Sequence, residues 1–199
     1  MINTIICMYI TLIPLICTGI FTMIFCKMRV CMKLNVPIDG GKCLKDGKRI
    51  FGDNKTVKGF IGYMLIGLLC NVIWGEICSI NAYLETHNYL YVNYENTIIY
   101  NIIMGFIIGL VYALFELPNS FIKRRLDIKP GNSLESKKIL RYIFLIIDQC
   151  DSIIGCVLVV WAVYPLGLLK YLLYVFLGLV THMVFNVILY VFKVRKTIV

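Results

Sequence analysis

The feature that most constrains this chain is a series of long apolar segments, the first of which runs from Met1 to Cys26 without a charged side chain. About 20 mostly apolar residues are enough for an α-helix to cross the hydrocarbon core of a bilayer. Four later segments have that length, with approximate bounds Val57–Ile80, Thr97–Leu117, Ile139–Pro165 and Leu168–Phe192. We therefore predict an all-α integral membrane protein with about five transmembrane helices, forming a single membrane domain over residues 1–199.

The composition agrees with a lipid environment. Of the 199 residues, 60% are hydrophobic and 16% are charged, whereas soluble domains carry about 25% charged residues. The first segment has no positive n-region and no small-residue cleavage site, so we interpret it as a retained helix. The nine cysteines show no metal-ligand spacing, and most lie in apolar segments, where a thiol behaves as a small hydrophobe.

The distribution of basic residues predicts the orientation. Of the 20 Lys and Arg residues, nine lie from Lys27 to Lys58 and seven from Lys123 to Arg141, while the segment between Ile80 and Thr97 has none. The positive-inside rule then places loops at about 27–57 and 118–138 in the cytoplasm, together with the C-terminus, and the N-terminus outside. We expect a multi-pass protein of the cell (plasma) membrane with its active site facing the cytoplasm. A simpler explanation of the net charge of +9 is that the basic residues only set the topology and bind anionic lipid head groups.

The first basic loop contains glycines that allow tight turns and bring backbone N–H groups close to a ligand, namely Gly40, Gly41, Gly47 and Gly52. We expect Asp53, Asn54 or Thr56 to cap the second helix. Lys55 and Lys58 then lie at the N-terminus of that helix, where an anion is favoured. A phosphate-binding site is one interpretation, and a solvated linker before a capped helix is the other. The loop is not a Walker P-loop.

The second basic loop begins after a proline. Pro118 is expected to break or kink the third helix, which can turn Asn119 and Ser120 toward a cavity. The basic residues that follow can neutralise a polyphosphate or contact lipid head groups, and they are Lys123, Arg124 and Lys129.

Two carboxylates give the sharper sign of a site. Asp148 and Asp151 stand three residues apart, so on a helix they share a face, and they lie among apolar residues. Ionisable residues at membrane depth are costly and usually functional. With Glu116 they offer hard oxygen ligands of the kind that suit Mg²⁺ bound to substrate phosphates. The alternative is a structural role, in which these acids pair with basic residues, namely Arg141, Lys123 or Arg124. His182 and Asn186, one turn apart, can face the same cavity or bond a neighbouring helix.

Three ordered motifs resemble the CDP-archaeol synthase family: Asp46–Phe60, then Ser120–Arg125 with Ile128–Gly131, then Asp148–Gly155. The resemblance covers nearly the whole chain. The family is distantly similar to the phosphatidate cytidylyltransferases, whose Ser-x-x-Lys-Arg-x4-Lys pattern is matched by Ser120, Lys123, Arg124 and Lys129. One departure stands out, because this chain has Phe115 and Glu116 where the family usually has Gly-Asp.

The resemblance implies that a lipid phosphomonoester attacks the α-phosphorus of CTP, which releases pyrophosphate and gives a CDP-activated lipid, with Mg²⁺ as cofactor. The alternatives are the same chemistry on phosphatidic acid or another lipid phosphate, and a non-catalytic membrane protein that binds lipid or anions. The expected partners are CTP, a membrane lipid phosphate and the bilayer, without nucleic acid, and a homodimer is left open.

The same resemblance, joined to the chemistry above, assigns roles to residues. The expected catalytic residues are Asp148, Asp151, Lys123 and Lys55. The expected CTP- and phosphate-binding residues are Asp46, Gly47, Arg49, Gly52, Asn54, Lys55, Thr56, Ser120, Lys123, Arg124 and Lys129. The expected metal ligands are Asp148, Asp151 and Glu116.

Overall fold

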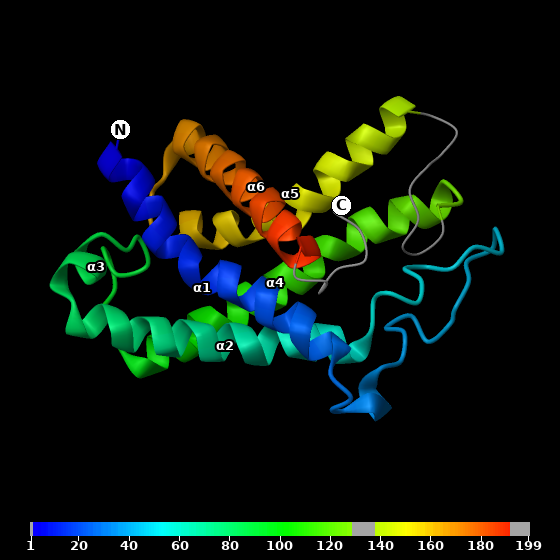
Figure 1. Ribbon diagram of the computed structural model, residues 1–199, viewed down its shortest axis with the longest axis horizontal. Coiled ribbons are helices and arrows are strands. Elements are labelled where there is room, and N and C mark those ends of the chain that lie inside the picture. The colour runs from blue at the N-terminus through cyan, green and yellow to red at the C-terminus, as the bar shows by residue number, and fades with distance from the viewer. Residues whose placement is uncertain (1, 129–137, 192–199) are drawn as a thin grey trace.

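The computed structural model describes residues 2–128 and 138–191, and five of its helices are long and apolar enough to cross a membrane. These helices are α1 (Ile2–Lys27), α2 (Val57–Ile80), α4 (Ile98–Arg125), α5 (Lys138–Val163) and α6 (Gly167–Val191) (Figure 1). A 3-10 turn, η1 (Met32–Leu34), and a short helix, α3 (Ala82–Thr86), lie in the connections. Within the described residues there is no strand, so the predicted all-α class and the number of spans are confirmed.

The third apolar helix is longer than the sequence predicted. It was expected to end near Leu117, but α4 continues through Pro118 to Arg125, so the following loop begins at Leu126 and not at residue 118. A proline removes one backbone N–H, a loss that membrane helices tolerate when other groups satisfy the freed carbonyl. The last turn of α4 also contains Lys123, Arg124 and Arg125, whose positive charges interact favourably with a helix C-terminus. Residues 118–125, which were expected in a cytoplasmic loop, are therefore helical.

Glycines bring α2 and α4 into close contact. A Cβ atom added to Gly109 would lie 2.1 Å from the carbonyl oxygen of Tyr63, and one added to Gly105 would lie 2.6 Å from the carbonyl oxygen of Gly67. Small residues allow membrane helices to approach backbone to backbone. This contact fixes Tyr63 of α2 beside α4, where the ring of Tyr63 stacks on Tyr112 at a centroid distance of 4.4 Å.

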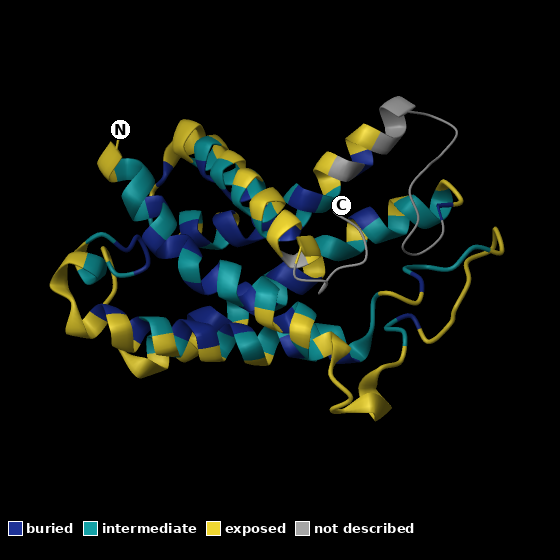
Figure 2. Cartoon of the chain, viewed as in Figure 1, coloured by how far each residue is buried: buried dark blue, intermediate teal, exposed yellow. Residues whose placement is uncertain are grey.

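The remaining helices complete the bundle around a core of apolar side chains from α1, α4, α5 and α6. The core includes Leu12, Ile108 and Val157, and the Tyr174 hydroxyl of α6 donates a 2.8 Å hydrogen bond to the Met8 carbonyl of α1. Buried residues lie mainly in the middle of the bundle, and exposed residues lie along its outer faces (Figure 2). Many of those exposed residues are large and hydrophobic, as expected where lipid is the solvent.

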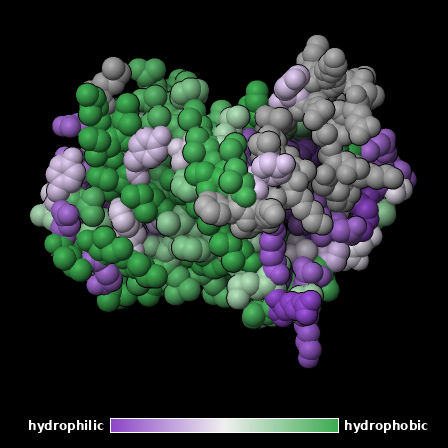
Figure 3. Space-filling model, viewed as in Figure 1, coloured by the Kyte–Doolittle hydropathy of each residue, from purple (hydrophilic) through white to green (hydrophobic). Residues whose placement is uncertain are grey.

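The two ends of the bundle differ. The N-terminus and α3 lie toward one end, whereas the connection between α1 and α2 and the C-terminal end of α4 lie at the other (Figure 1). Hydrophobic residues dominate the surface over the helices, and strongly hydrophilic residues gather around the α1–α2 connection (Figure 3). The polar site predicted from the sequence is therefore built at one end of an apolar bundle.

Candidate active site

Residues 28–56, which we call the basic loop, are organised around one buried carboxylate. The side chain of Asp39 has no exposed surface. Its oxygens accept hydrogen bonds from the backbone N–H groups of Gly41, Phe51 and Gly52 at 2.9–3.0 Å, and the Arg49 guanidinium donates to it at 2.7 Å. Burial alone would raise the pKa of Asp39, but Arg49 and the three backbone donors outweigh it and hold that pKa well below its usual range.

The end of the basic loop is tied to its beginning just before α2. The Ile38 N–H donates to the Lys55 carbonyl at 2.8 Å, and the Val57 N–H donates to the Val36 carbonyl at 2.9 Å. Thr56 caps α2, because its hydroxyl accepts the Gly59 N–H at 3.1 Å. The sequence named Thr56 among three candidate caps, and this one is confirmed. The geometry places Lys55 at the inner edge of the loop.

Lys55 reaches into the bundle and meets a carboxylate of α4. Its ammonium group forms an ion pair with Glu116, and the Tyr63 hydroxyl donates to the other Glu116 oxygen at 3.0 Å. Burial alone would lower the pKa of Lys55, but the charge of Glu116, with smaller effects from Asp151 and Asp148, raises it. Lys55 therefore carries its charge within reach of all three carboxylates that the sequence singled out.

The two aspartates of α5 share a partner on α4. The Asn119 side-chain amide donates to Asp148 at 2.6 Å and to Asp151 at 2.9 Å, so both carboxylates face the same nitrogen, as their three-residue spacing predicted. The Lys123 ammonium forms an ion pair with Asp148. This pair is one of the structural pairings that the sequence left open. We call Lys55, Tyr63, Glu116, Asn119, Lys123, Asp148 and Asp151 the inner polar cluster.

A second group of charges lies at the tip of the basic loop, and we call it the outer ion-pair cluster. Lys48 donates to Asp127 at 2.6 Å, and Arg125 donates to Asp46 at 2.7 Å and to the Arg49 carbonyl. Arg49 also pairs with Asp53 at 2.8 Å. The contacts of Lys48 and Arg125 fasten the loop to the end of α4. Asp46 and Arg49, predicted to bind phosphate, are thus engaged in holding the loop, and Gly47 and Gly52 supply its left-handed turns, with φ of 74° and 92°.

Other predicted residues are placed differently. Lys58 is fully buried, and its ammonium donates to the Cys26 and Met28 carbonyls at the end of α1, so it does not face an anion site. Arg124 has a buried Nε without a hydrogen-bond partner in the described part of the chain. Ser120 is half-buried on α4, and Lys129 lies outside the described residues.

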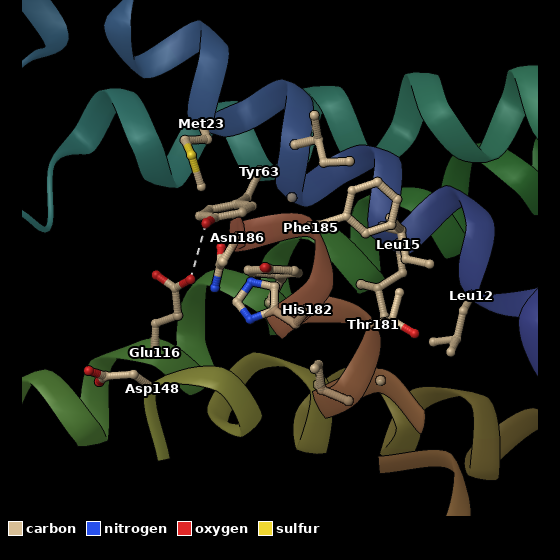
Figure 4. Close-up of a pocket in the computed structure, with 16 residues that line it drawn as sticks. Leu12, Leu15, Met23, Tyr63, Glu116, Asp148, Thr181, His182, Phe185 and Asn186 are labelled. Carbon is tan, nitrogen blue, oxygen red and sulfur yellow. Dashed lines mark hydrogen bonds between the residues drawn. The ribbon is translucent and has the colours of Figure 1, made fainter. Parts of the chain in front are cut away.

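Two adjoining cavities meet at the inner polar cluster. A wide cleft of about 770 Å³ opens beside the basic loop and is lined by Asn54, Lys55 and Thr56. A narrower cavity of about 180 Å³ runs into the bundle between α1 and α6 and is mostly apolar. Tyr63 and Glu116 line both. Figure 4 shows Glu116 and Asp148 at one end of the narrower cavity and Leu12 at the far end, with His182 and Asn186 between them.

The inner polar cluster contains oxygen atoms of the kind that bind a divalent cation. Among the described residues no three Asp, Glu, His or Cys side chains are already gathered as ligands, and lysines occupy two of the three carboxylates. Asp148 and Asp151 nevertheless face one point, and the buried Oδ1 of Asn119 has no hydrogen-bond partner in the described part of the chain. Such oxygen donors are those that Mg²⁺ prefers.

Two contributors were not identified from the sequence. Asp39 carries a weak signal, because an aspartate before a Gly-Gly pair often bonds nearby backbone N–H groups. Tyr63 lies in an apolar segment and gave no signal, because its role depends on the approach of α4 to α2.

The fold and the inner polar cluster define an intramembrane protein that brings cations and carboxylates together beside an apolar cavity. A family model described as CarS-like CDP-archaeol synthase matches residues 1–198. The chain therefore belongs to the CDP-archaeol synthase family, which confirms the resemblance found in the motifs. This is a family of CTP-dependent cytidylyltransferases that act on a lipid phosphate.

Individual relatives agree with the family model. The chain is 29% identical to a CDP-archaeol synthase of Methanoculleus marisnigri over 168 residues, which cover 80% of this chain and 87% of that one. It is 26% identical to the Methanocaldococcus jannaschii CDP-archaeol synthase over 154 residues, or 77% and 78% of the two chains. A match to the Pyrococcus furiosus CDP-archaeol synthase is 37% identical and spans 48% of each chain.

One solved structure is similar in fold. It is described as "Structural insight into an intramembrane enzyme for archaeal membrane lipids biosynthesis" and shares 24% sequence identity. The TM-score is 0.55, and the similarity covers 89% of this chain and 91% of that chain. At this identity the likeness supports the fold alone.

Proposed function

We propose that this chain transfers the cytidylyl group of CTP to an archaeol-type lipid phosphomonoester, giving a CDP-activated lipid and pyrophosphate. The observation that carries the proposal is the position of the inner polar cluster, where a polar cleft and an apolar cavity share Tyr63 and Glu116 as walls. A reaction between a water-soluble nucleotide and a membrane lipid needs such a junction. By the positive-inside rule, this end of the bundle faces the cytoplasm of the cell.

The nucleotide occupies the wide cleft. Its triphosphate lies toward Lys55 and the α2 N-terminus, where the charge and the helix dipole both favour an anion. Lys123, which pairs with Asp148 in the inner polar cluster, supplies a second ammonium group, and Arg124 adds a guanidinium that has no ion pair among the described residues. The glycine turns of the basic loop, held by Asp39, bring backbone N–H donors to the rim of the wide cleft.

The lipid occupies the narrower cavity. The apolar walls from α1 and α6 contact its hydrocarbon chain, and its phosphate lies at the Glu116 and Asp148 end, close to the nucleotide (Figure 4). Because only part of a lipid fits into about 180 Å³, the rest of the chains lie in the surrounding bilayer. A lipid can enter this site sideways, without leaving the membrane.

The chemistry requires positioning and charge neutralisation more than covalent catalysis. A lipid phosphate oxygen forms a bond to the α-phosphorus of CTP, and the bond from that phosphorus to the oxygen bridging to the β-phosphate breaks, so that pyrophosphate leaves. Lys55, Lys123 and Arg124 neutralise the phosphates and orient them. Asp148 and Asp151, with Glu116 and the side-chain amide oxygen of Asn119, would hold Mg²⁺, which when bound neutralises charge on the reacting phosphates.

The test uses purified protein in mild detergent with CTP, Mg²⁺ and a lipid panel. The panel contains an ether-linked isoprenoid glycerol phosphate and an ester-linked phosphatidic acid, and CDP-lipid is detected by mass spectrometry. We expect CDP-lipid mainly from the ether lipid, and its loss in Asp151→Asn. Product from phosphatidic acid alone would overturn the choice of lipid. If folded protein yields no product from either lipid, the cytidylyltransferase assignment is wrong and a lipid-binding role is favoured.

A further inference from the structure

Both lysines of the inner polar cluster are paired with carboxylates of the same cluster. Lys55 pairs with Glu116 and Lys123 pairs with Asp148, so the two lysines that face phosphate and two of the three candidate metal ligands neutralise each other. All four side chains are at most partly exposed, with relative accessibilities of 17–36%. In such surroundings, water screens a charge less than it does at an open surface.

We propose that these two ion pairs make the site selective for a metal–nucleotide complex over either free component. Lys55 and Lys123 stay paired with the carboxylates until substrate phosphates bind the two lysines. The carboxylates in turn stay paired with the lysines until a divalent cation takes the place of the lysines. This inference rests on the proposed function, because it assumes that phosphates and a cation bind at this cluster.

The charge balance supports such an exchange. A cation that arrives alone meets two carboxylates, Glu116 and Asp148, that are already neutralised, and it would leave a displaced ammonium group without a partner in a partly buried place. A nucleotide that arrives alone would likewise separate each lysine from its carboxylate and place its phosphates beside the acids. When both arrive together, each lysine exchanges a carboxylate for a phosphate and each carboxylate exchanges a lysine for the cation. Only the joint exchange leaves both lysines and both of their carboxylates with a partner of opposite charge.

Tyr63 keeps one carboxylate in place during the exchange. Its hydroxyl bonds the Glu116 oxygen that Lys55 does not contact, and its ring is stacked on Tyr112. Gly109 also holds the Tyr63 backbone against α4. Glu116 therefore remains at the junction of the two cavities when Lys55 turns to phosphate, which makes Tyr63 a positioning residue for Glu116.

The experiment measures binding by calorimetry on the full chain in detergent, with Mg²⁺ alone, CTP alone and the two together. In the unsubstituted protein we expect weak binding of each alone and clear binding of the mixture. Lys55→Met and Lys123→Met remove an internal counter-charge, so each should bind Mg²⁺ alone at least about tenfold more tightly. Each should also bind the Mg²⁺–CTP mixture more weakly.

Two controls isolate the charge effect. Lys55→Arg keeps the positive charge and should leave the binding of Mg²⁺ alone as weak as in the unsubstituted protein. Lys48→Met removes a lysine that pairs with the exposed Asp127 in the outer ion-pair cluster, and it should not tighten the binding of Mg²⁺ alone. Equal Mg²⁺ affinity in the unsubstituted protein and in both Met variants of the inner cluster would overturn the proposal.

Thermal unfolding gives a second readout that needs no turnover. Mg²⁺ without nucleotide should raise the melting temperature of Lys55→Met and Lys123→Met by more than that of the unsubstituted protein, because a ligand stabilises the state that it binds. CDP-lipid formation by the unsubstituted protein is measured separately. Tighter metal binding in the variants without any CDP-lipid in the unsubstituted protein would refute the function and support the exchange. CDP-lipid formation by the unsubstituted protein, with unchanged metal affinity in the variants, would support the function and refute the exchange.

Discussion

Lys55 and Glu116 form an ion pair across 61 positions of sequence, between the last residues of the basic loop and the C-terminal half of the membrane helix α4. The pair lies where the wide cleft and the narrower cavity meet. It links the loop expected to hold the nucleotide to the helix that carries one of the expected metal ligands.

The two aspartates of α5 are expected to be essential for turnover. Asp148→Asn and Asp151→Asn each remove a negative charge that faces Asn119, and each should lower the rate of CDP-lipid formation by about 100-fold or more. Asp127→Asn is the matched control, because its side chain is 75% exposed and outside the inner polar cluster. Rates within about threefold of the unsubstituted protein in both α5 variants would contradict this assignment.

Glu116 tests the departure from the usual family sequence. Glu116→Gln keeps the size of the side chain and its capacity to accept from Tyr63 but removes the charge. If Glu116 helps to hold the metal, the Mg²⁺ concentration for half-maximal activity should rise by about tenfold. Titration of activity with Mg²⁺ at saturating CTP measures this shift. An unchanged Mg²⁺ dependence would show that Glu116 serves only as the partner of Lys55 and Tyr63.

Asp39 should make the stability of the basic loop depend on acid. Its pKa in the folded chain is lower than the value of about 3.9 in an unfolded chain. The carboxylate therefore stabilises the fold above about pH 4, and that contribution is lost as the pH falls through the folded pKa. Asp39→Asn should lower the stability by about 1–3 kcal/mol at neutral pH, because buried donors lose a charged acceptor.

The pH dependence of that difference separates charge from packing. The gap in melting temperature between the unsubstituted protein and Asp39→Asn should shrink as the pH falls from neutral to about 3. A gap that stays constant over this range would mean that the charge of Asp39 does not stabilise the loop.

The close approach of α2 and α4 should tolerate no side chain at Gly109. In Gly109→Ala the added Cβ would overlap the Tyr63 carbonyl oxygen at 2.1 Å, so the helices must separate, at a cost of about 1–3 kcal/mol. Thermal unfolding in detergent measures the loss, and Leu69→Ala, at a 56% exposed position of α2, is the comparison. If both variants unfold at the same temperature, the glycine contact does not hold these helices together.

The sequence predicted the membrane helices well because length and apolarity alone determine them. The second predicted span, Val57–Ile80, coincides with α2, and the others differ from their helices mainly at the ends. The exception is α4, which continues beyond Pro118. A proline and a run of basic residues usually suggest the end of a helix, and the sequence gives no sign that a membrane helix will tolerate both.

The sequence predicted which chemical groups form the candidate site better than it predicted which residues contact one another. The spacing of Asp148 and Asp151 indicated a shared face, and their common contact with Asn119 confirms it. The burial of Lys58 against the end of α1 could not be predicted, because it depends on how α1 packs on α2. Tyr63 and Asp39 are similar cases, since a hydroxyl or a carboxylate acquires its role only from the backbone that folds around it.

The most direct measurement follows the phosphates of CTP. The protein is incubated with lipid phosphate, Mg²⁺ and CTP that carries a radioactive label at either the α- or the γ-phosphate. We predict that the α-label enters the lipid fraction and the γ-label leaves in pyrophosphate, because the bond between the α- and β-phosphates breaks. A γ-label in the lipid, or no label in the lipid from either nucleotide, would contradict cytidylyl transfer as the reaction of this chain.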